Sequence, residues 1–221
     1  MACRSVDKAN AAKAEIEAGG ITGSISTVQL DVTDDESITK AAASVEQQFG
    51  RLDILVNNAA MGVSDLDART RFLRTMETNT FGPYQVAKAF RPLLLKSTCS
   101  SSAYSIYVTS GLGSLANTFE NPPHPNTPPD AEAYNACKAA LNMYMLLDWR
   151  QSKADKTNVK VFAMCPGFVV SNLRGPSEAA RNPGGMAGDP REAGELVLSI
   201  VQGRRDADEG RVVRSEGTWP W

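Results

Sequence analysis

The chain alternates short apolar runs with longer segments of helix formers, and this alternation constrains the fold more than any other feature. Short β-branched or apolar runs predict strands at 24–31, 52–56, 104–108, 159–164 and 211–214. Segments rich in helix formers predict helices at 6–18, 35–49, 68–97, 134–150 and 191–202. Strands that alternate with helices predict an α/β fold, with a doubly wound parallel sheet and helices on both of its faces.

Local features refine this prediction. The run 52–56 is almost entirely apolar, which predicts a strand buried on both faces. Gly82-Pro83 interrupts the long helical segment and predicts a bend there. The segment 111–130 carries five of the 12 prolines and predicts a loop, and 172–189 is rich in Gly, Pro and Asn without a clear period.

Composition excludes several classes of protein. The 221 residues predict a single domain spanning 1–221, and the formal net charge of −2 gives no reason to expect nucleic acid or an anionic membrane as a partner. No apolar run reaches the length of a membrane span, and no secretion signal is visible. The four scattered cysteines include no CxxC pair, so we expect reduced thiols in a cytoplasmic protein.

Small and polar residues follow several of the predicted strands. They are Asp31, the run Asn57-Asn58-Ala59-Ala60, Ser110 and the pair Pro166-Gly167. In a parallel sheet, ligands bind beyond the carboxyl ends of the strands, so these positions predict a binding site. Each also has an ordinary structural interpretation, because Asn favours turns and Ser caps them.

Tyr134 and Lys138 stand four residues apart in a segment whose alanines predict a helix, so their side chains should share one face. A cation beside a phenol favours the phenolate and lowers a pKa near ~10 towards neutrality. Such a tyrosine can exchange a proton with a carbonyl or an alcohol. The same spacing is also typical of two surface residues on a helix.

Asn79 lies inside the long predicted helix, where asparagine is mildly unfavourable. It is either a surface residue or part of a bend whose freed carbonyl binds a water.

The single histidine, His124, lies in the proline-rich loop and cannot build a multi-histidine metal site, so no metal is expected. A serine hydrolase using Ser110 and His124 is an alternative, but no GxSxG elbow accompanies them. That alternative requires ester hydrolysis that survives loss of Lys138.

Residues 111–116 fit the dinucleotide-binding pattern G-x-G-x-x-A. A dinucleotide fingerprint requires a helix directly after the glycines, but the prolines that follow here predict that no helix forms.

Taken together and in this order, these motifs resemble the short-chain dehydrogenase/reductase family. Residues 52–60 are similar to its Asn-Asn-Ala-Gly motif, with Ala60 in place of Gly, and 30–33 resemble its adenine-contacting segment. Pro166-Gly167 with Ser171 resembles its motif near the nicotinamide. The residues that match its catalytic set are Asn79, Ser110, Tyr134 and Lys138.

The resemblance implies hydride transfer between a nicotinamide dinucleotide and a carbonyl/alcohol pair on a small-molecule substrate. Tyr134 would be the acid/base, Lys138 would hold the ribose and lower the pKa of Tyr134, Ser110 would orient the substrate oxygen, and Asn79 would hold a relay water. Residues 172–189 would form a substrate lid. The family often pairs subunits through its long helices, so a homo-oligomer is possible. The implied cofactor-binding residues are Asp31, Val32, Asn58, Ala59, Ala60, Tyr134, Lys138, Pro166, Gly167 and Ser171.

The resemblance departs from the family at two places. The separation of Ser110 and Tyr134, 134 − 110 = 24 residues, is longer than is common and includes the proline-rich loop. The family's first strand, Gly-rich turn and first helix have no counterpart, so the chain is expected to be N-terminally truncated relative to the family. The missing strand is expected between the strand at 24–31 and the one ending near residue 3.

Arg4 follows that second strand, and a basic residue there can meet a 2′-phosphate, which favours NADP over NAD. The alternative to an enzyme is a non-catalytic binding or regulatory protein, or an inactive fragment that kept the fold.

Overall fold

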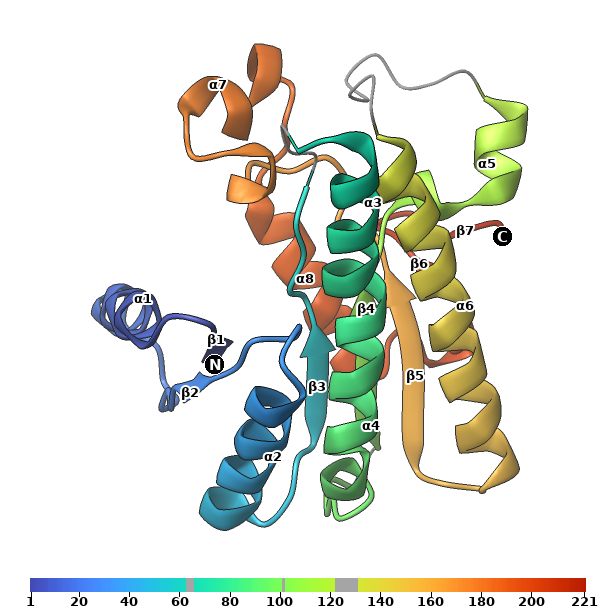
Figure 1. The fold of residues 1–221 in the computed structure, drawn as a ribbon. Coiled ribbons are helices and arrows are strands. Elements are labelled where there is room, and N and C mark those ends of the chain that lie inside the picture. Colours follow the sequence, from blue (N-terminus) through green and yellow to red (C-terminus); the bar gives the residue numbers. More distant parts are fainter. Residues whose placement is uncertain (63–65, 101, 122–130) are drawn as a thin grey trace.

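The structure is a computed structural model that describes residues 1–62, 66–100, 102–121 and 131–221 (Figure 1). Its main sheet has the order β3-β4-β5-β6-β7. The first four of these strands run parallel, and the last is antiparallel to β6. The strands are β3 (Ile54–Asn57), β4 (Ala103–Val108), β5 (Val159–Met164), β6 (Val212–Val213) and β7 (Thr218–Trp219).

Helices cover both faces of this sheet (Figure 1). One core cluster joins the sheet to α4 and α6, and a second joins its other face to α8. The predicted α/β fold with a parallel sheet is therefore confirmed. The helices are α1 (Val6–Ala18), α2 (Asp35–Phe49), α3 (Ala68–Met76), α4 (Gly82–Leu94), α5 (Leu115–Glu120), α6 (Glu132–Ala154), α7 (Glu178–Arg181) and α8 (Pro190–Val201).

The two N-terminal strands form a separate parallel pair, β1 (Ala2–Cys3) with β2 (Val28–Gln29). The strand predicted at 24–31 is thus only two residues long. The prediction of a missing strand between these two is wrong, because they hydrogen-bond directly; Leu30 N–H donates to the Cys3 carbonyl at 3.0 Å. Among the described strands, neither β1 nor β2 pairs with β3.

β3 lies at the edge of the main sheet and pairs there with β4 alone among the described strands. Ile54 and Val56 are 41% and 38% exposed. The prediction of a strand buried on both faces is therefore wrong. The apolar composition of 52–56 favours a strand, but the position of a strand in the sheet depends on contacts between distant parts of the chain.

The long helix predicted over 68–97 bends where expected. A π-helical segment, Glu77–Phe81, separates α3 from α4. Pro83 has no N–H, so the Asn79 carbonyl lacks its ordinary α-helical donor. Gly82 allows a close approach here, since a Cβ on it would lie 2.7 Å from the Val32 carbonyl oxygen.

Three C-terminal features differ from the sequence predictions or extend them. A short helix, α5, follows Gly111–Gly113, so the prediction that no helix forms there is wrong. The predicted strand at 211–214 shortens to β6 and is followed by β7, which the sequence did not reveal. The segment 172–189 contains short helical turns that include α7. His124 lies outside the described residues.

Candidate active site

The predicted catalytic side chains converge beyond the carboxyl ends of β3, β4 and β5. Ser110 follows β4, and Tyr134 and Lys138 lie in the first two turns of α6. The Ser110 hydroxyl lies close enough to the Tyr134 hydroxyl to lower the pKa of the phenol. The Lys138 ammonium lies 5.6 Å from the centroid of the Tyr134 ring. The expectation that Tyr134 and Lys138 share a face of a helix is therefore confirmed.

Lys138 is held by the backbone of the neighbouring strand. Its side chain is buried, with 2% exposure, and its Nζ donates a hydrogen bond of 2.8 Å to the Val108 carbonyl. Burial lowers the pKa of Lys138 to about 8, although the neighbouring Cys137 and Cys165 thiols act in the opposite direction. The ammonium is consequently a buried cation with a single fixed hydrogen-bond partner among the described residues.

The pKa of Tyr134 contradicts the sequence-based expectation. Burial raises it well above its ordinary value, and the Cys137 and Cys165 thiols act in the same direction. The hydrogen bond from Ser110 and the charge of Arg174 lower it, but they do not compensate for burial. The prediction that Lys138 lowers this pKa towards neutrality is wrong, because i,i+4 spacing carries no information about desolvation.

The buried lysine should give stability a specific pH dependence. The folded-state pKa of Lys138, about 8, lies below its ordinary value of 10.5. Between these values the unfolded chain binds more protons, so the free energy of unfolding should rise with pH, by at most about 1.4 kcal/mol per pH unit. Urea denaturation of the wild type and of Lys138→Met at about pH 8 and pH 9.5 measures the difference. Parallel stability curves for the two proteins would contradict the prediction.

Asn79 is fully buried in the π-helical segment. Its amide donates to the Met61 carbonyl and accepts from the Met61 N–H, both at 2.8 Å. The Nδ2 atom also contacts the Cys137 sulfur at 3.4 Å. The side chain thus fastens the loop after β3 to helix α6, so Asn79 is not a surface residue.

The predicted adenine segment lies at the end of β2. The Asp31 carboxylate accepts hydrogen bonds from the Thr33 N–H and hydroxyl, and the first of these is the main cause that lowers its pKa. The charge of Arg4 acts in the same direction, so Arg4 and Asp31 are neighbours. An open depression of about 520 Å³ adjoins this segment, with Val32, Thr33, Asp34, Asp35, Glu77 and Phe81 as its lining.

The predicted cofactor-binding residues Asn58, Ala59 and Ala60 follow β3, and Pro166 and Gly167 follow β5. Asn58, Ala59 and Ala60 are exposed in the loop after β3. The preceding Asn57 is buried, and its Nδ2 donor has no hydrogen-bond partner within the described residues. Gly167 follows β5 with a φ of 79°, a conformation that favours glycine. An unused buried donor and exposed small side chains fit a polar, flat ligand at this end of the sheet.

Comparison with known proteins decides the family. A family model described as short chain dehydrogenase matches residues 1–182. The chain belongs to the short-chain dehydrogenase family. The dehydrogenase/reductase tropE of Talaromyces stipitatus is 37% identical over 212 residues, which covers 87% of this chain and 75% of tropE. The dehydrogenase anuI of Penicillium roqueforti is 31% identical over 226 residues, with coverage of 99% and 84%.

Solved structures share the fold of this short-chain dehydrogenase. The NADPH-bound carbonyl reductase from chicken fatty liver superposes with a TM-score of 0.77 at 24% identity, covering all of this chain and 86% of that protein. Carbonyl reductase Sniffer of D. melanogaster has a TM-score of 0.76 at 22% identity, with the same coverage.

The G-x-G-x-x-A sequence of this short-chain dehydrogenase serves packing. A Cβ on Gly111 would lie 2.8 Å from the Trp219 ring, and one on Gly113 would lie 2.7 Å from the Lys138 carbonyl carbon. These glycines are therefore covered by protein atoms. Among the described residues, no other Gly-rich turn opens a helix after a strand.

Sequence reasoning missed three contributors to the site. Arg174 binds the carbonyls of Val169, Ala180 and Arg181 at 2.8–3.1 Å and so ties the predicted lid together. Cys165 accepts a hydrogen bond from the Gly111 N–H at 3.2 Å. The third is Trp219, whose ring packs against Gly111. No local pattern marks these residues, because their roles depend on contacts between separate elements.

Proposed function

We propose that the protein is an NAD(P)-dependent oxidoreductase that interconverts a carbonyl and an alcohol, with Tyr134 as the acid/base. The observation that carries this proposal is the position of the Tyr134 phenol, which lies beside the buried Lys138 ammonium and close enough to the Ser110 hydroxyl for that hydroxyl to lower its pKa. Two hydroxyls that meet at the carboxyl end of a parallel sheet can bind one substrate oxygen between them.

Each residue has a distinct task in this proposal. A bound reduced nicotinamide would supply the hydride that reaches the carbonyl carbon. Tyr134 donates its proton to the carbonyl oxygen as the alcohol forms, and Ser110 orients that oxygen. Lys138 binds the ribose hydroxyls with its remaining N–H donors. Asn79 fixes the loop after β3, and its carbonyl, which lacks the Pro83 donor, accepts a hydrogen bond from a relay water.

The raised pKa of Tyr134 suits the reductive direction. A protonated phenol at neutral pH is ready to donate its proton, whereas alcohol oxidation requires the phenolate and therefore favours alkaline pH.

We propose NADP as the preferred cofactor, because Arg4 stands just after β1 and could meet a 2′-phosphate, and because a structural relative is NADPH-bound. Four free cysteines suit a reducing compartment such as the cytoplasm.

Cofactor binding and turnover test the proposal directly. NADPH titrated against the chain should bind one to one, and NADPH oxidation should occur with at least one member of a panel of small ketones and aldehydes. Arg4→Gln should weaken NADPH binding more than NADH binding. Absence of any turnover that depends on Tyr134 would refute the catalytic assignment.

A non-catalytic binding protein is the second candidate. The separation of β1 and β2 from the main sheet favours it. It predicts that NADPH neither binds measurably nor is oxidised, even with every catalytic side chain present.

A further inference from the structure

The C-terminal residues lie against the turn that carries Ser110, although Ser114 and Pro220 are 106 positions apart in the chain. The Ser114 hydroxyl donates to the Pro220 carbonyl at 2.6 Å. The Ala116 N–H donates to the main-chain oxygen of Trp221 at 2.8 Å. Two hydrogen bonds therefore join the C-terminal segment to the residues that follow Gly111, the glycine that Trp219 contacts.

Trp219 packs directly against the residue after Ser110. A Cβ on Gly111 would lie 2.8 Å from Cε2 and Cζ2 of the indole, so the ring occupies the space of a side chain. The Gly111 N–H donates to the Cys165 sulfur at 3.2 Å. Gly111 is thus fixed between the indole and the thiol, with no room to move towards the ring.

The indole is itself held firmly. Trp219 pairs with Val212 in the antiparallel β6–β7 ladder, and the Arg214 guanidinium lies 4.4 Å from the ring centroid. Arg205 donates to the carbonyls of Arg214 and Gly217 at 3.0 and 2.8 Å, which fixes the hairpin turn between the two strands. The indole ring is therefore held in place and limits the movement of the turn that begins at Gly111.

We propose that Trp219 is a positioning residue that holds the Ser110 hydroxyl against Tyr134. The inference rests on the proposed function, since it assigns Trp219 a part in that reaction. The Ser110 hydroxyl accepts the Leu112 N–H at 3.2 Å, so its direction follows the backbone of the turn. A shift of Gly111 into vacated space would rotate this hydroxyl away from the phenol.

The main experiment compares Trp219→Ala with Trp149→Ala. Trp149 is a matched control, since it also packs on a glycine: a Cβ on Gly210 would lie 2.8 Å from the Trp149 ring. The Nε1 atoms of both tryptophans are buried without a hydrogen-bond partner among the described residues. Both variants should lose stability. Only Trp219→Ala should lower kcat, on the order of tenfold to a hundredfold, with the NADPH Kd unchanged. Trp219→Phe, which keeps an aromatic ring over Gly111, should restore most of the rate.

Two further readouts separate positioning from a purely structural role. The Ser110 hydrogen bond lowers the pKa of Tyr134, so its loss in Trp219→Ala should move the pH profile of alcohol oxidation to higher pH. Amide hydrogen exchange at Leu112 and Gly113 should accelerate in Trp219→Ala and stay unchanged in Trp149→Ala. This second readout needs neither cofactor nor turnover.

A reciprocal substitution tests the contact itself. Gly111→Ala should disturb the turn in the wild type, because the new methyl meets the indole. In a Trp219→Ala background the same methyl has room, so the two substitutions should be strongly non-additive in stability.

The outcomes are distinguishable. An unshifted pH profile, unchanged exchange at the turn, or additive stability effects would each overturn the role of Trp219. Absence of Tyr134-dependent turnover in the wild type would instead overturn the proposed function, and the exchange and additivity measurements would still decide whether Trp219 positions the turn.

Discussion

Tyr134→Phe is expected to lower kcat/KM for carbonyl reduction by about 10²–10⁴-fold, the usual contribution of a positioned general acid. The substitution removes only the hydroxyl that meets Ser110 and leaves the ring beside Lys138. NADPH binding should therefore change little. Steady-state kinetics, together with a direct titration of NADPH, measures both quantities.

Tyr144→Phe is the matched control. Tyr144 lies on the same helix, α6, and its ring stacks on Tyr84 at a centroid distance of 4.6 Å. It also loses one hydroxyl, but far along the helix from Ser110, so its activity should equal that of the wild type. Retention of activity in Tyr134→Phe within a few-fold would show that the proton comes from another group.

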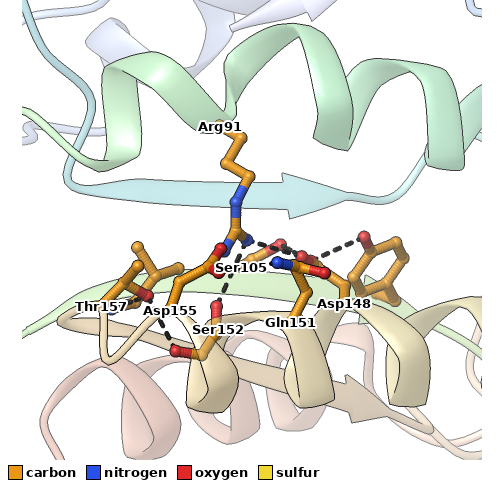
Figure 2. Close-up of polar contacts among 9 residues, drawn as sticks. Arg91, Ser105, Asp148, Gln151, Ser152, Asp155 and Thr157 are labelled. Carbon is orange, nitrogen blue, oxygen red and sulfur yellow. Dashed lines mark hydrogen bonds and ion pairs between the residues drawn. The ribbon is translucent and has the colours of Figure 1, made fainter.

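The largest expected effect on stability comes from Arg91 of α4, whose side chain extends towards Asp148 and Ser152 of α6 (Figure 2). Its Nη1 contacts the Asp148 carboxylate at 2.8 Å and the Ser152 hydroxyl at 3.3 Å. Arg91→Met leaves the Asp148 carboxylate without this cation. Breaking such a pair should lower the free energy of unfolding by about 2–4 kcal/mol, less than for a completely buried pair because both side chains keep slight exposure.

Urea denaturation measures this loss, and pH tests its cause. Burial raises the pKa of Asp148, so the carboxyl becomes neutral as pH falls through that pKa and the penalty in Arg91→Met should shrink. The Arg91→Met/Asp148→Asn double variant removes the unpaired charge and keeps an amide oxygen for the Tyr107 and Ser105 hydroxyls, so it should recover part of the stability. Lys96→Met, which breaks the exposed pair of Lys96 with Glu46, should cost under about 1 kcal/mol. Equal losses in Arg91→Met and Lys96→Met would contradict the assignment.

The Asp148 carboxylate also explains why this part of the interior accepts polar groups. It accepts hydrogen bonds from the Tyr107 hydroxyl at 3.0 Å and the Ser105 hydroxyl at 3.4 Å, both on β4. The sequence predicts only a strand at 104–108. A polar network within this core cannot be recognised from β4 alone, because its acceptor lies on α6.

Several elements could be predicted because their signals are local. Asp189-Pro190 marks the start of α8, and the Asp189 carboxylate does accept the Arg191 N–H. Gly82-Pro83 marked the bend that became the π-helical segment. The Tyr134–Lys138 spacing predicted a shared helix face. Each of these signals acts within a few residues, so the order of amino acids is sufficient to reveal it.

Residue order alone determined the alternation of strands and helices, the family resemblance and the set Asn79, Ser110, Tyr134 and Lys138. Tertiary structure alone decided that β3 is an exposed edge, that the pKa of Tyr134 rises, and that Trp219 packs beside Ser110. The physical reason is the range of the interactions. Propensity and capping act between neighbours in the chain, whereas burial, desolvation and strand pairing depend on residues brought together from distant positions.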